Sequence, residues 1–202
     1  LGGDALYLSP NEIGLGKRES VADVARVLEG YVDIIMARVF DHQHILELAK
    51  YASIPVINGL SDYDHPCQGL TDVLTMLEHK GKVEGLNVVY VGDGNNMATS
   101  VMHTVAKLGA NFTIANPEGY DISETGIKVG KEIAKESGVE LRFLRDPHEA
   151  VKDADVIYTD TWTSMGQEEE TAIREKVFPP YQVNAKLVSE AKPDVIVMHC
   201  LP

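Results

Sequence analysis

The sequence contains little cysteine and no long apolar run. Its two cysteines, Cys67 and Cys200, lie far apart in 202 residues, which excludes a disulfide framework and a cysteine-rich metal site and makes a reducing cytoplasm the default compartment. The longest apolar runs, such as "VDIIMA", are much shorter than a membrane-spanning helix, and the first ten residues lack the regions of a signal peptide. We expect a cytoplasmic protein with no membrane partner.

Basic residues are also scarce. Lys and Arg number 18 against 31 Asp and Glu, which gives a formal net charge of -13 at pH 7. Binding to a phosphate backbone needs clustered Lys and Arg, whereas the basic residues here are scattered, so nucleic acid is excluded as a main partner. A small cationic substrate would be attracted.

The chain instead alternates short β-branched runs with helical runs. The candidate strands are residues 5–8, 31–37, 54–57, 86–91, 111–115, 141–144, 155–159 and 194–198. Helix starts are indicated by Ser20, Asp146 and Asn184, and helix ends by Gly109 and Gly138. This alternation predicts an α/β fold of two Rossmann-like domains, with parallel sheets flanked by helices.

The polar stretch "EHKGKVEG", residues 78–85, is the best candidate for a domain boundary. It predicts one domain over residues 1–80 and a second over residues 81–202. The chain opens in a candidate strand and closes at "MHCLP", directly after another, which predicts a fragment of a longer protein whose first domain is incomplete.

Ligands of open parallel sheets bind outside the carboxyl ends of the strands. Five predicted strand ends have polar or reactive residues after them: Arg38, "LSDYDHPCQ", "GDGNN", "DTWTSMG" and "HCLP". We expect the functional site along this edge.

In "DHPCQ", Pro66 suits the first turn of a helix, which places His65 at the cap and Gln68 in the same turn. Such a site can hold an anion or polarise a carbonyl oxygen, although an isolated His-Pro more often only caps its helix. Arg38 at a neighbouring strand end favours an anionic partner.

The stretch "GDGNN" after a strand suggests dinucleotide binding, but the third glycine is missing and Ala115 and Asn116 stand where an acidic residue is needed. A nicotinamide cofactor is therefore disfavoured. Asn95 and Asn96 offer amides for the α-ammonium and α-carboxylate of an amino acid, or they cap the next helix.

Two further strand ends leave alternatives open. Asp160 either holds a cation or is a turn residue, and Cys200 is a nucleophile, a polar contact or a buried apolar group. His199 would point to the opposite face if the strand continued, so no catalytic triad is indicated. No local spacing resembles a metal site.

The motifs "MARVF", "HPCQ", "VGDGNN", "DTWTSMGQE" and "MHCLP", in this order and spacing, resemble the ornithine carbamoyltransferase family over the whole chain. The resemblance implies transfer of a carbamoyl group from carbamoyl phosphate to the side-chain amine of L-ornithine, giving L-citrulline and phosphate. Residues 1–80 would bind carbamoyl phosphate and residues 81–202 would bind ornithine. A homotrimer or a multiple of trimers is implied, with no cofactor and no metal.

The resemblance also assigns roles to residues. Arg38, His65 and Gln68 would contact carbamoyl phosphate, and Arg38 and His65 would polarise its carbonyl oxygen. Cys200 and Leu201 would lie where the substrates meet, with Cys200 orienting the amine and forming no covalent bond. Ornithine would be bound by Asn96, Asp160, Ser164 and Met165. The Ser-Met-Gly loop would close over ornithine, with Gly166 as its hinge and Trp162 packing beside it.

Two departures from the family pattern bear on activity. The Ser-Thr-Arg-Thr phosphate motif of the family falls before residue 1, and its last arginine and C-terminal helix fall after residue 202. Gly14 stands where many relatives have a Gln or His that reaches a neighbouring subunit, and Lys17 or Arg18 is a possible substitute. We therefore expect little turnover from these 202 residues alone.

Two alternative functions stay open at this point. One is a catalytically incompetent fragment or non-catalytic oligomerisation module, and the other is a nucleotide-binding module indicated by the strand followed by "GDGNN". The sequence does not distinguish arginine synthesis from the catabolic direction.

Overall fold

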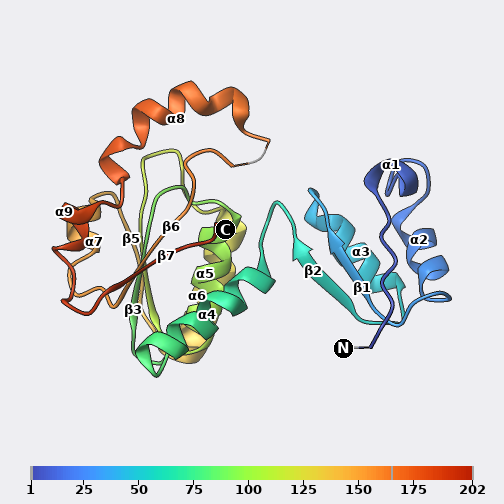
Figure 1. Cartoon of the computed structure of the whole chain (residues 1–202), viewed down its shortest axis with the longest axis horizontal. Coiled ribbons are helices and arrows are strands. Elements are labelled where there is room, and N and C mark those ends of the chain that lie inside the picture. Colours follow the sequence, from blue (N-terminus) through green and yellow to red (C-terminus); the bar gives the residue numbers. More distant parts are fainter. Residues whose placement is uncertain (1, 165, 202) are drawn as a thin grey trace. The chain divides into compact units, whose positions relative to one another are not determined.

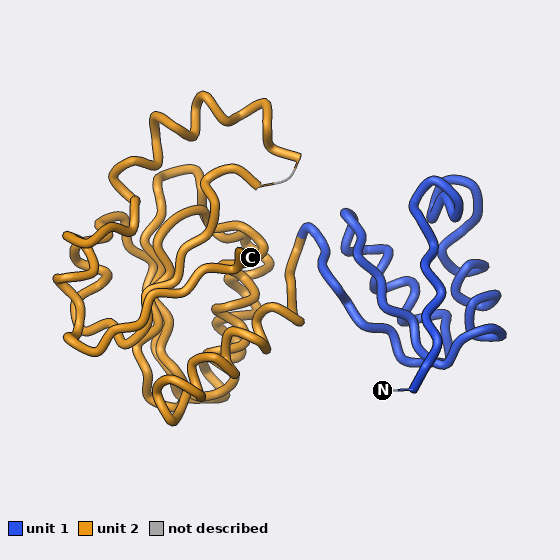
Figure 2. The backbone as a smooth tube through the Cα atoms, viewed as in Figure 1, with its two compact units in different colours: residues 1–62 blue, residues 63–202 orange. Residues whose placement is uncertain are grey.

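The structure, a computed structural model, describes residues 2–164 and 166–201. It divides into two compact units, residues 1–62 and residues 63–202 (Figure 2). Met165, one of the predicted ornithine ligands, lies outside the described residues. The division after Asp62 groups the helix that begins at Pro66 with the second unit, and the sequence-based domain boundary near residue 80 stays a prediction.

The first unit holds a two-stranded parallel sheet. Its elements are α1 (Pro10–Ile13), α2 (Val21–Leu28), β1 (Ile35–Arg38), α3 (His42–Tyr51) and β2 (Val56–Leu60). Val21, Ala25 and Leu48 form a buried cluster with partly buried neighbours, and Val24, Ile35 and Ile45 are buried as well. The predicted strand at residues 5–8 is wrong, because this segment pairs with no described strand and leaves Leu6 and Tyr7 exposed.

The second unit is built on a five-stranded sheet in the order β5-β4-β3-β6-β7, with every described pairing parallel (Figure 1). Its strands are β3 (Asn87–Val91), β4 (Asn111–Ala115), β5 (Leu141–Leu144), β6 (Val156–Thr159) and β7 (Ile196–His199). The strands β3, β4 and β6 are almost wholly buried, as expected for a sheet covered on both faces. The predicted α/β class with parallel sheets flanked by helices is confirmed.

Helices cover both faces of this sheet. The helices of this unit are α4 (Pro66–Lys80), α5 (Asn96–Lys107), α6 (Glu124–Ser137), α7 (Pro147–Ala150), α8 (Thr171–Val177) and α9 (Ala185–Val188), with 3-10 turns η1 (Glu168–Glu170) and η2 (Pro179–Tyr181); all except α8 lie over the faces. One core lies between the sheet and α4 and α5, and the other lies under α7 and α9. Figure 1 shows α8 beyond the carboxyl-end edge of the sheet.

The helix boundaries follow local chemistry that the sequence predicts. Ser20, Asp146 and Asn184 each cap a helix by accepting a backbone N–H, and Gly138 ends α6 with a positive φ of 74°. Gly109 has a φ of 83° one residue past the cap of α5. These predictions are confirmed. Within the described ranges no helix is both long and apolar enough to cross a membrane.

The strand order reverses direction at β3. The chain leaves β3 for β4 on one side and later returns to β6 on the other side. In such sheets the crevice outside the carboxyl ends at this reversal point is the usual ligand site, because the loops after the two strands diverge there. The relevant loops are residues 92–95 after β3 and residues 160–167 after β6.

Candidate active site

Asn95 links the two loops at the reversal point. Its Oδ1 caps α5 by accepting from the backbone N–H groups of Met97 and Ala98, at 2.9 and 3.1 Å. The Tyr90 hydroxyl donates to the same Oδ1 at 3.2 Å. With its oxygen fully used, Asn95 turns its Nδ2 outward and donates to Asp160 Oδ2 at 2.9 Å. The cap of one helix therefore also orients the acid after β6.

Asp160, the residue after β6, accepts hydrogen bonds from residues that follow the two neighbouring strands. Its Oδ1 accepts from the Thr161 backbone N–H at 2.7 Å and from Cys200 Sγ at 3.0 Å. Three strands, β3, β6 and β7, thus deliver Asn95, Asp160 and Cys200 to one half-buried cluster. Ser164 Oγ lies 3.5 Å from Asn95 Nδ2, at the outer edge of hydrogen-bond range. An acid with partners on both oxygens has a fixed orientation and still has lone pairs for a ligand cation.

The chemistry of Cys200 follows from this contact. Burial, together with the hydrogen bond to Asp160 and its negative charge, raises the pKa of the Cys200 thiol from 9.0 to about 12. Cysteine attacks as the thiolate, and a thiol with this pKa stays protonated at neutral pH. The geometry argues against a nucleophilic role and favours a polar contact.

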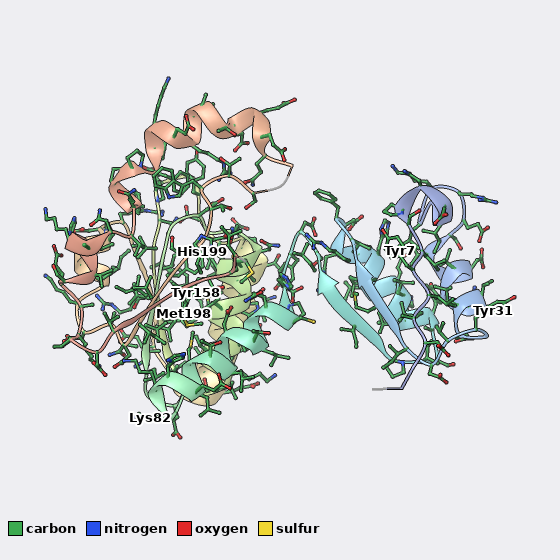
Figure 3. All side chains as sticks on the ribbon, in the orientation of Figure 1. Tyr7, Tyr31, Lys82, Tyr158, Met198 and His199 are labelled. Atoms are coloured by element: carbon green, nitrogen blue, oxygen red, sulfur yellow. The ribbon has the colours of Figure 1, made fainter. Side chains whose placement is uncertain are left out.

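Two stacked tyrosine rings are buried on the strands that precede the cluster of Asn95, Asp160 and Cys200. The rings of Tyr90 and Tyr158 lie 5.6 Å apart at 13°, and both side chains are fully buried. Burial is the main cause that raises the pKa of Tyr158, followed by the negative charge of Asp72. Figure 3 labels Tyr158 on β6 and Met198, its partner in register on β7. Because the pKa of both tyrosines is raised, both phenols stay protonated and uncharged.

The start of α4 places His65, Gln68 and Asp72 in succession. His65 is the N-cap as predicted: its Nδ1 accepts from the Gln68 backbone N–H at 3.4 Å, and Pro66 is the first helical residue. The His65 backbone N–H donates to Ser100 Oγ on α5 at 2.6 Å. Gln68 donates from Nε2 to Asp72 Oδ1 at 2.9 Å. His65 and Gln68 are thus fixed on the same unit as Asp160.

Arg38 belongs to the first unit. It is the last residue of β1 and is exposed there. Lys17 and Arg18 are also exposed, and Arg18 donates to the Glu12 carbonyl at 3.4 Å. Gly14 has a left-handed φ of 54°, and a Cβ there would approach Arg18 Cβ to 2.9 Å. The backbone therefore favours glycine at this position.

A buried ion pair holds the loop after β6. Arg174 of α8 donates to Asp93 Oδ2 at 2.6 Å and to the Trp162 carbonyl at 2.9 Å. Burial raises the pKa of Asp93, and the Arg174 guanidinium opposes that shift. The Trp162 ring stacks on Phe178 at 6.1 Å, so the predicted packing of the indole beside the loop has a definite partner. A cavity of about 530 Å³ lies here, lined in part by Asp93, Arg174 and Asn95.

One set of potential metal ligands exists among the described residues. Asp160, His199 and Cys200 each offer one ligand atom, and these atoms lie within 4.8 Å of one another. The strand β7 ends at His199, so the alternation of side chains that a continued strand would impose on His199 and Cys200 does not apply. His199 Nδ1 also accepts from the Leu201 backbone N–H at 3.0 Å. The expectation that no metal is needed stays a prediction.

The "GDGNN" turn uses its glycine for protein packing. A Cβ on Gly94 would lie 2.3 Å from the Ile122 backbone nitrogen, so the glycine allows the loop after β4 to approach. Asn116 Nδ2 donates to the Tyr120 carbonyl and to Asp121, both at 2.9 Å. Asn116 therefore holds the loop after β4 at the place where the dinucleotide fingerprint needs an acidic residue.

Sequence reasoning missed part of the site. It selected Asn96 as the ornithine ligand, whereas Asn95 makes the contact with Asp160; the role of Asn96 stays a prediction. It also missed Asp72, Tyr158 and Arg174. Helical spacing i, i+4 from Gln68 could have indicated Asp72, but nothing in one sequence pairs Arg174 with an acid 81 positions earlier.

Comparison with known proteins identifies the family of the chain. Residues 1–78 match the family model "Aspartate/ornithine carbamoyltransferase, carbamoyl-P binding domain", and residues 84–202 match "Aspartate/ornithine carbamoyltransferase, Asp/Orn binding domain". Ornithine carbamoyltransferase of Thermococcus kodakarensis is 59% identical over 202 residues, covering 100% of this chain and 64% of that protein. The Bacillus subtilis enzyme of the same name is 56% identical, with 63% of its length covered.

The fold comparison gives the same result. The structure of ornithine carbamoyltransferase from Pyrococcus furiosus superposes with a TM-score of 0.94 at 57% identity, covering 100% of this chain and 64% of that chain. The present chain thus spans about 64% of the length of these relatives. Both family models together account for nearly all of the sequence, and the chain belongs to the aspartate/ornithine carbamoyltransferase family.

Proposed function

We propose that this chain takes part in carbamoyl transfer from carbamoyl phosphate to the side-chain amine of L-ornithine, giving L-citrulline and phosphate. The observation that supports it most directly is the cluster of Asn95, Asp160 and Cys200 at the carboxyl ends of β3, β6 and β7. This cluster lies inside the segment that matches the Asp/Orn binding domain. The names of relatives at 56–59% identity support the choice of ornithine.

The Asp160 carboxylate suits the side-chain amine of ornithine. The ornithine side-chain ammonium has a pKa close to that of lysine, about 10.4, and must lose a proton before it attacks. Asp160 would position this amine while Cys200 donates to the same carboxylate. Asn96, Ser164 and Met165 would bind the amino-acid end, and the loop after β6 would close over it.

Carbamoyl phosphate would be bound by Arg38, His65 and Gln68, with Cys200 and Leu201 beside it. The amine nitrogen attacks the carbonyl carbon, the nitrogen loses a proton, and the bond from that carbon to the phosphate oxygen breaks. Donors from Arg38 and His65 would stabilise the negative charge that develops on the carbonyl oxygen. The role of Arg38 rests on the family resemblance and on the match of residues 1–78 to the carbamoyl-P binding domain.

The setting of the enzyme belongs to the same proposal. We expect a cytoplasmic homotrimer that uses carbamoyl phosphate and ornithine, without a cofactor. The Pyrococcus furiosus relative has the name "Ornithine carbamoyltransferase, anabolic", which favours the direction of arginine synthesis. Mass measurement in solution would test the trimer, and a strict monomer would contradict it.

Calorimetric titration and a citrulline assay on the 202-residue chain test the function. We expect ornithine to bind, and Asp160→Asn to weaken that binding by at least tenfold, because the loss of a charged hydrogen bond costs about 1.5–3 kcal/mol. Asp155→Asn is the matched control, since Asp155 is a buried acid at the other end of β6 bound to Lys192. Citrulline turnover should be low, because the chain spans about 64% of its relatives.

Two results would contradict the proposal. Absence of binding for both ornithine and carbamoyl phosphate at millimolar concentration would exclude this reaction for the chain. Tight binding of NAD or ATP in the same titration would favour the nucleotide-binding alternative. Turnover comparable to full-length relatives would contradict the expected low activity, although not the reaction itself.

A further inference from the structure

Asp72 is a buried carboxylate that the reaction as proposed does not use. It lies on α4 with a relative exposure of 3%, and burial raises the pKa of its carboxyl group. Burying a charged group is costly unless hydrogen bonds compensate. Its position near the start of α4, one turn after Gln68, suggests what it does for the site.

The contact between Asp72 and Gln68 fixes the direction of an amide. Residues four apart on a helix share one face, and Gln68 Nε2 donates to Asp72 Oδ1 at 2.9 Å. An ionised carboxylate only accepts hydrogen bonds, so the amide must turn its NH2 group toward it. The Gln68 carbonyl oxygen, Oε1, then faces away from Asp72.

The second oxygen of Asp72 interacts with Tyr158 of β6. This oxygen, Oδ2, and the Tyr158 hydroxyl are both buried, and neither has a well-formed hydrogen bond to a described residue. The two groups are electrostatically coupled: the phenol lowers the pKa of Asp72, and the carboxylate raises the pKa of Tyr158. Tyr158 lies on β6, two residues before Asp160 (Figure 3).

We propose that Asp72 is a positioning residue that orients the Gln68 amide with its carbonyl oxygen toward the substrate, where it accepts a hydrogen bond from the NH2 group of a carbamoyl compound. The inference rests on the proposed function. Carbamoyl phosphate differs from other acyl phosphates by this NH2 group, its only nitrogen donor. The pair of Gln68 and Asp72 therefore determines specificity for carbamoyl over acetyl phosphate.

This orientation predicts strong discrimination. A site that offers a buried acceptor rejects a ligand that lacks the donor, because the acceptor is left unsatisfied. Acetyl phosphate has a methyl group at this position. A reversed amide would present NH2 to the NH2 of carbamoyl phosphate and remove the preference. A purely structural role of Asp72 would instead change the affinity for both compounds equally.

The test compares Kd values for carbamoyl and acetyl phosphate by calorimetry on the 202-residue chain. Wild type should prefer carbamoyl phosphate by at least about tenfold, and Asp72→Leu should remove most of that preference. Asp72→Asn should retain it within about threefold, since an asparagine oxygen still accepts from Gln68. Asp72→Leu should add nothing in a Gln68→Ala background, because Asp72 acts through Gln68. Asp155→Leu is the matched control.

An unchanged preference in Asp72→Leu, or an equal loss for both compounds, would overturn the proposal. A separate measurement tests the orientation of the Gln68 amide independently of the proposed function. In nitrogen-15 spectra the NH2 pair of Gln68, assigned by its disappearance in Gln68→Glu, should be protected from exchange without any ligand. Protection lost in Asp72→Leu supports the orientation even if neither phosphate binds. If Asp72→Leu does not fold, the wild-type protein still decides: a Gln68 NH2 group that is not protected from exchange would overturn the proposal.

Discussion

The two compact units differ in how their parallel strands are covered. In the second unit, strands β3 and β6 are buried on both faces, and two apolar clusters lie on opposite sides of the sheet. In the first unit, only two strands pair, and Met36 and Ile57 on those strands remain 63% and 40% exposed. Sheets with two strands are marginally stable unless other elements cover them.

This difference in core size determines which unit can bury charged side chains. The second unit buries Asp72, Asp93 and Arg174, which is costly, yet its large core offsets that cost. The core of the first unit is much smaller and consists of six buried apolar residues, Val21, Val24, Ala25, Ile35, Ile45 and Leu48. Among the polar side chains described there, Ser61 is the fully buried one. We therefore expect the second unit to unfold last, and Trp162, the only tryptophan, to report on it alone.

The largest expected effect is a cavity in the second unit. Phe112→Ala removes a fully buried ring of β4 and should lower the free energy of unfolding of this unit by about 4 kcal/mol. Urea unfolding followed by Trp162 fluorescence measures the midpoint. Leu48→Ala, at an equally buried position of the first unit, is the matched comparison. If Leu48→Ala shifts the Trp162 midpoint as much as Phe112→Ala does, the two units do not unfold independently.

The contrast between the units also explains which predictions from sequence succeeded. The strands and caps of the second unit were predictable, because continuous apolar runs and Ser, Asp and Asn before helices express local physics. The segment at residues 5–8 has the same apolar pattern, yet forms no strand because it has no described partner. A strand depends on its neighbour, which one sequence does not specify.

The site itself was predictable only in outline. Strand-end positions placed Asp160 and Cys200 at one edge of the five-stranded sheet, since parallel strands end together. The strand before His65, β2, belongs to the two-stranded sheet instead, so the expectation of one common edge does not extend to it. The choice between Asn95 and Asn96 depended on which side chain caps α5, and the pairing of Asp93 with Arg174 depended on how α8 returns to the sheet. Contacts of this kind arise from tertiary packing and leave no local signal.

The second expected effect breaks the buried ion pair of the larger unit. Arg174→Met removes the partner of Asp93 and the donor to the Trp162 carbonyl, and it leaves a buried charge uncompensated. We expect a loss of about 3 kcal/mol in the free energy of unfolding. Asp93→Asn combined with Arg174→Met should recover part of this loss, because no unpaired charge remains. Equal stability of the single and double variants would show that the charge of Asp93 is not the cause.

The order of the loop after β6 is a second readout of the ion pair between Asp93 and Arg174. Trp162 stacks on Phe178, and Arg174 lies between the tryptophan carbonyl and Asp93. Arg174→Met should therefore increase quenching of Trp162 fluorescence by acrylamide under native conditions. Arg142→Met, which breaks a more exposed pair with Glu149, is the control and should leave quenching unchanged.

The smallest effect on stability, and the sharpest test of the site, concerns Cys200. Its thiol pKa of about 12 exceeds the ordinary 9.0, so the folded state keeps a proton that the unfolded state loses. Stability from this group is present below pH 9 and falls as pH rises toward 12. In a Cys67→Ser background, alkylation of Cys200 by iodoacetamide should stay slow up to about pH 11. Asp160→Asn should lower this pKa, because it removes the negative charge that opposes the thiolate. A reactive Cys200 at neutral pH in the folded chain would instead indicate a nucleophilic thiolate and contradict the role assigned to it.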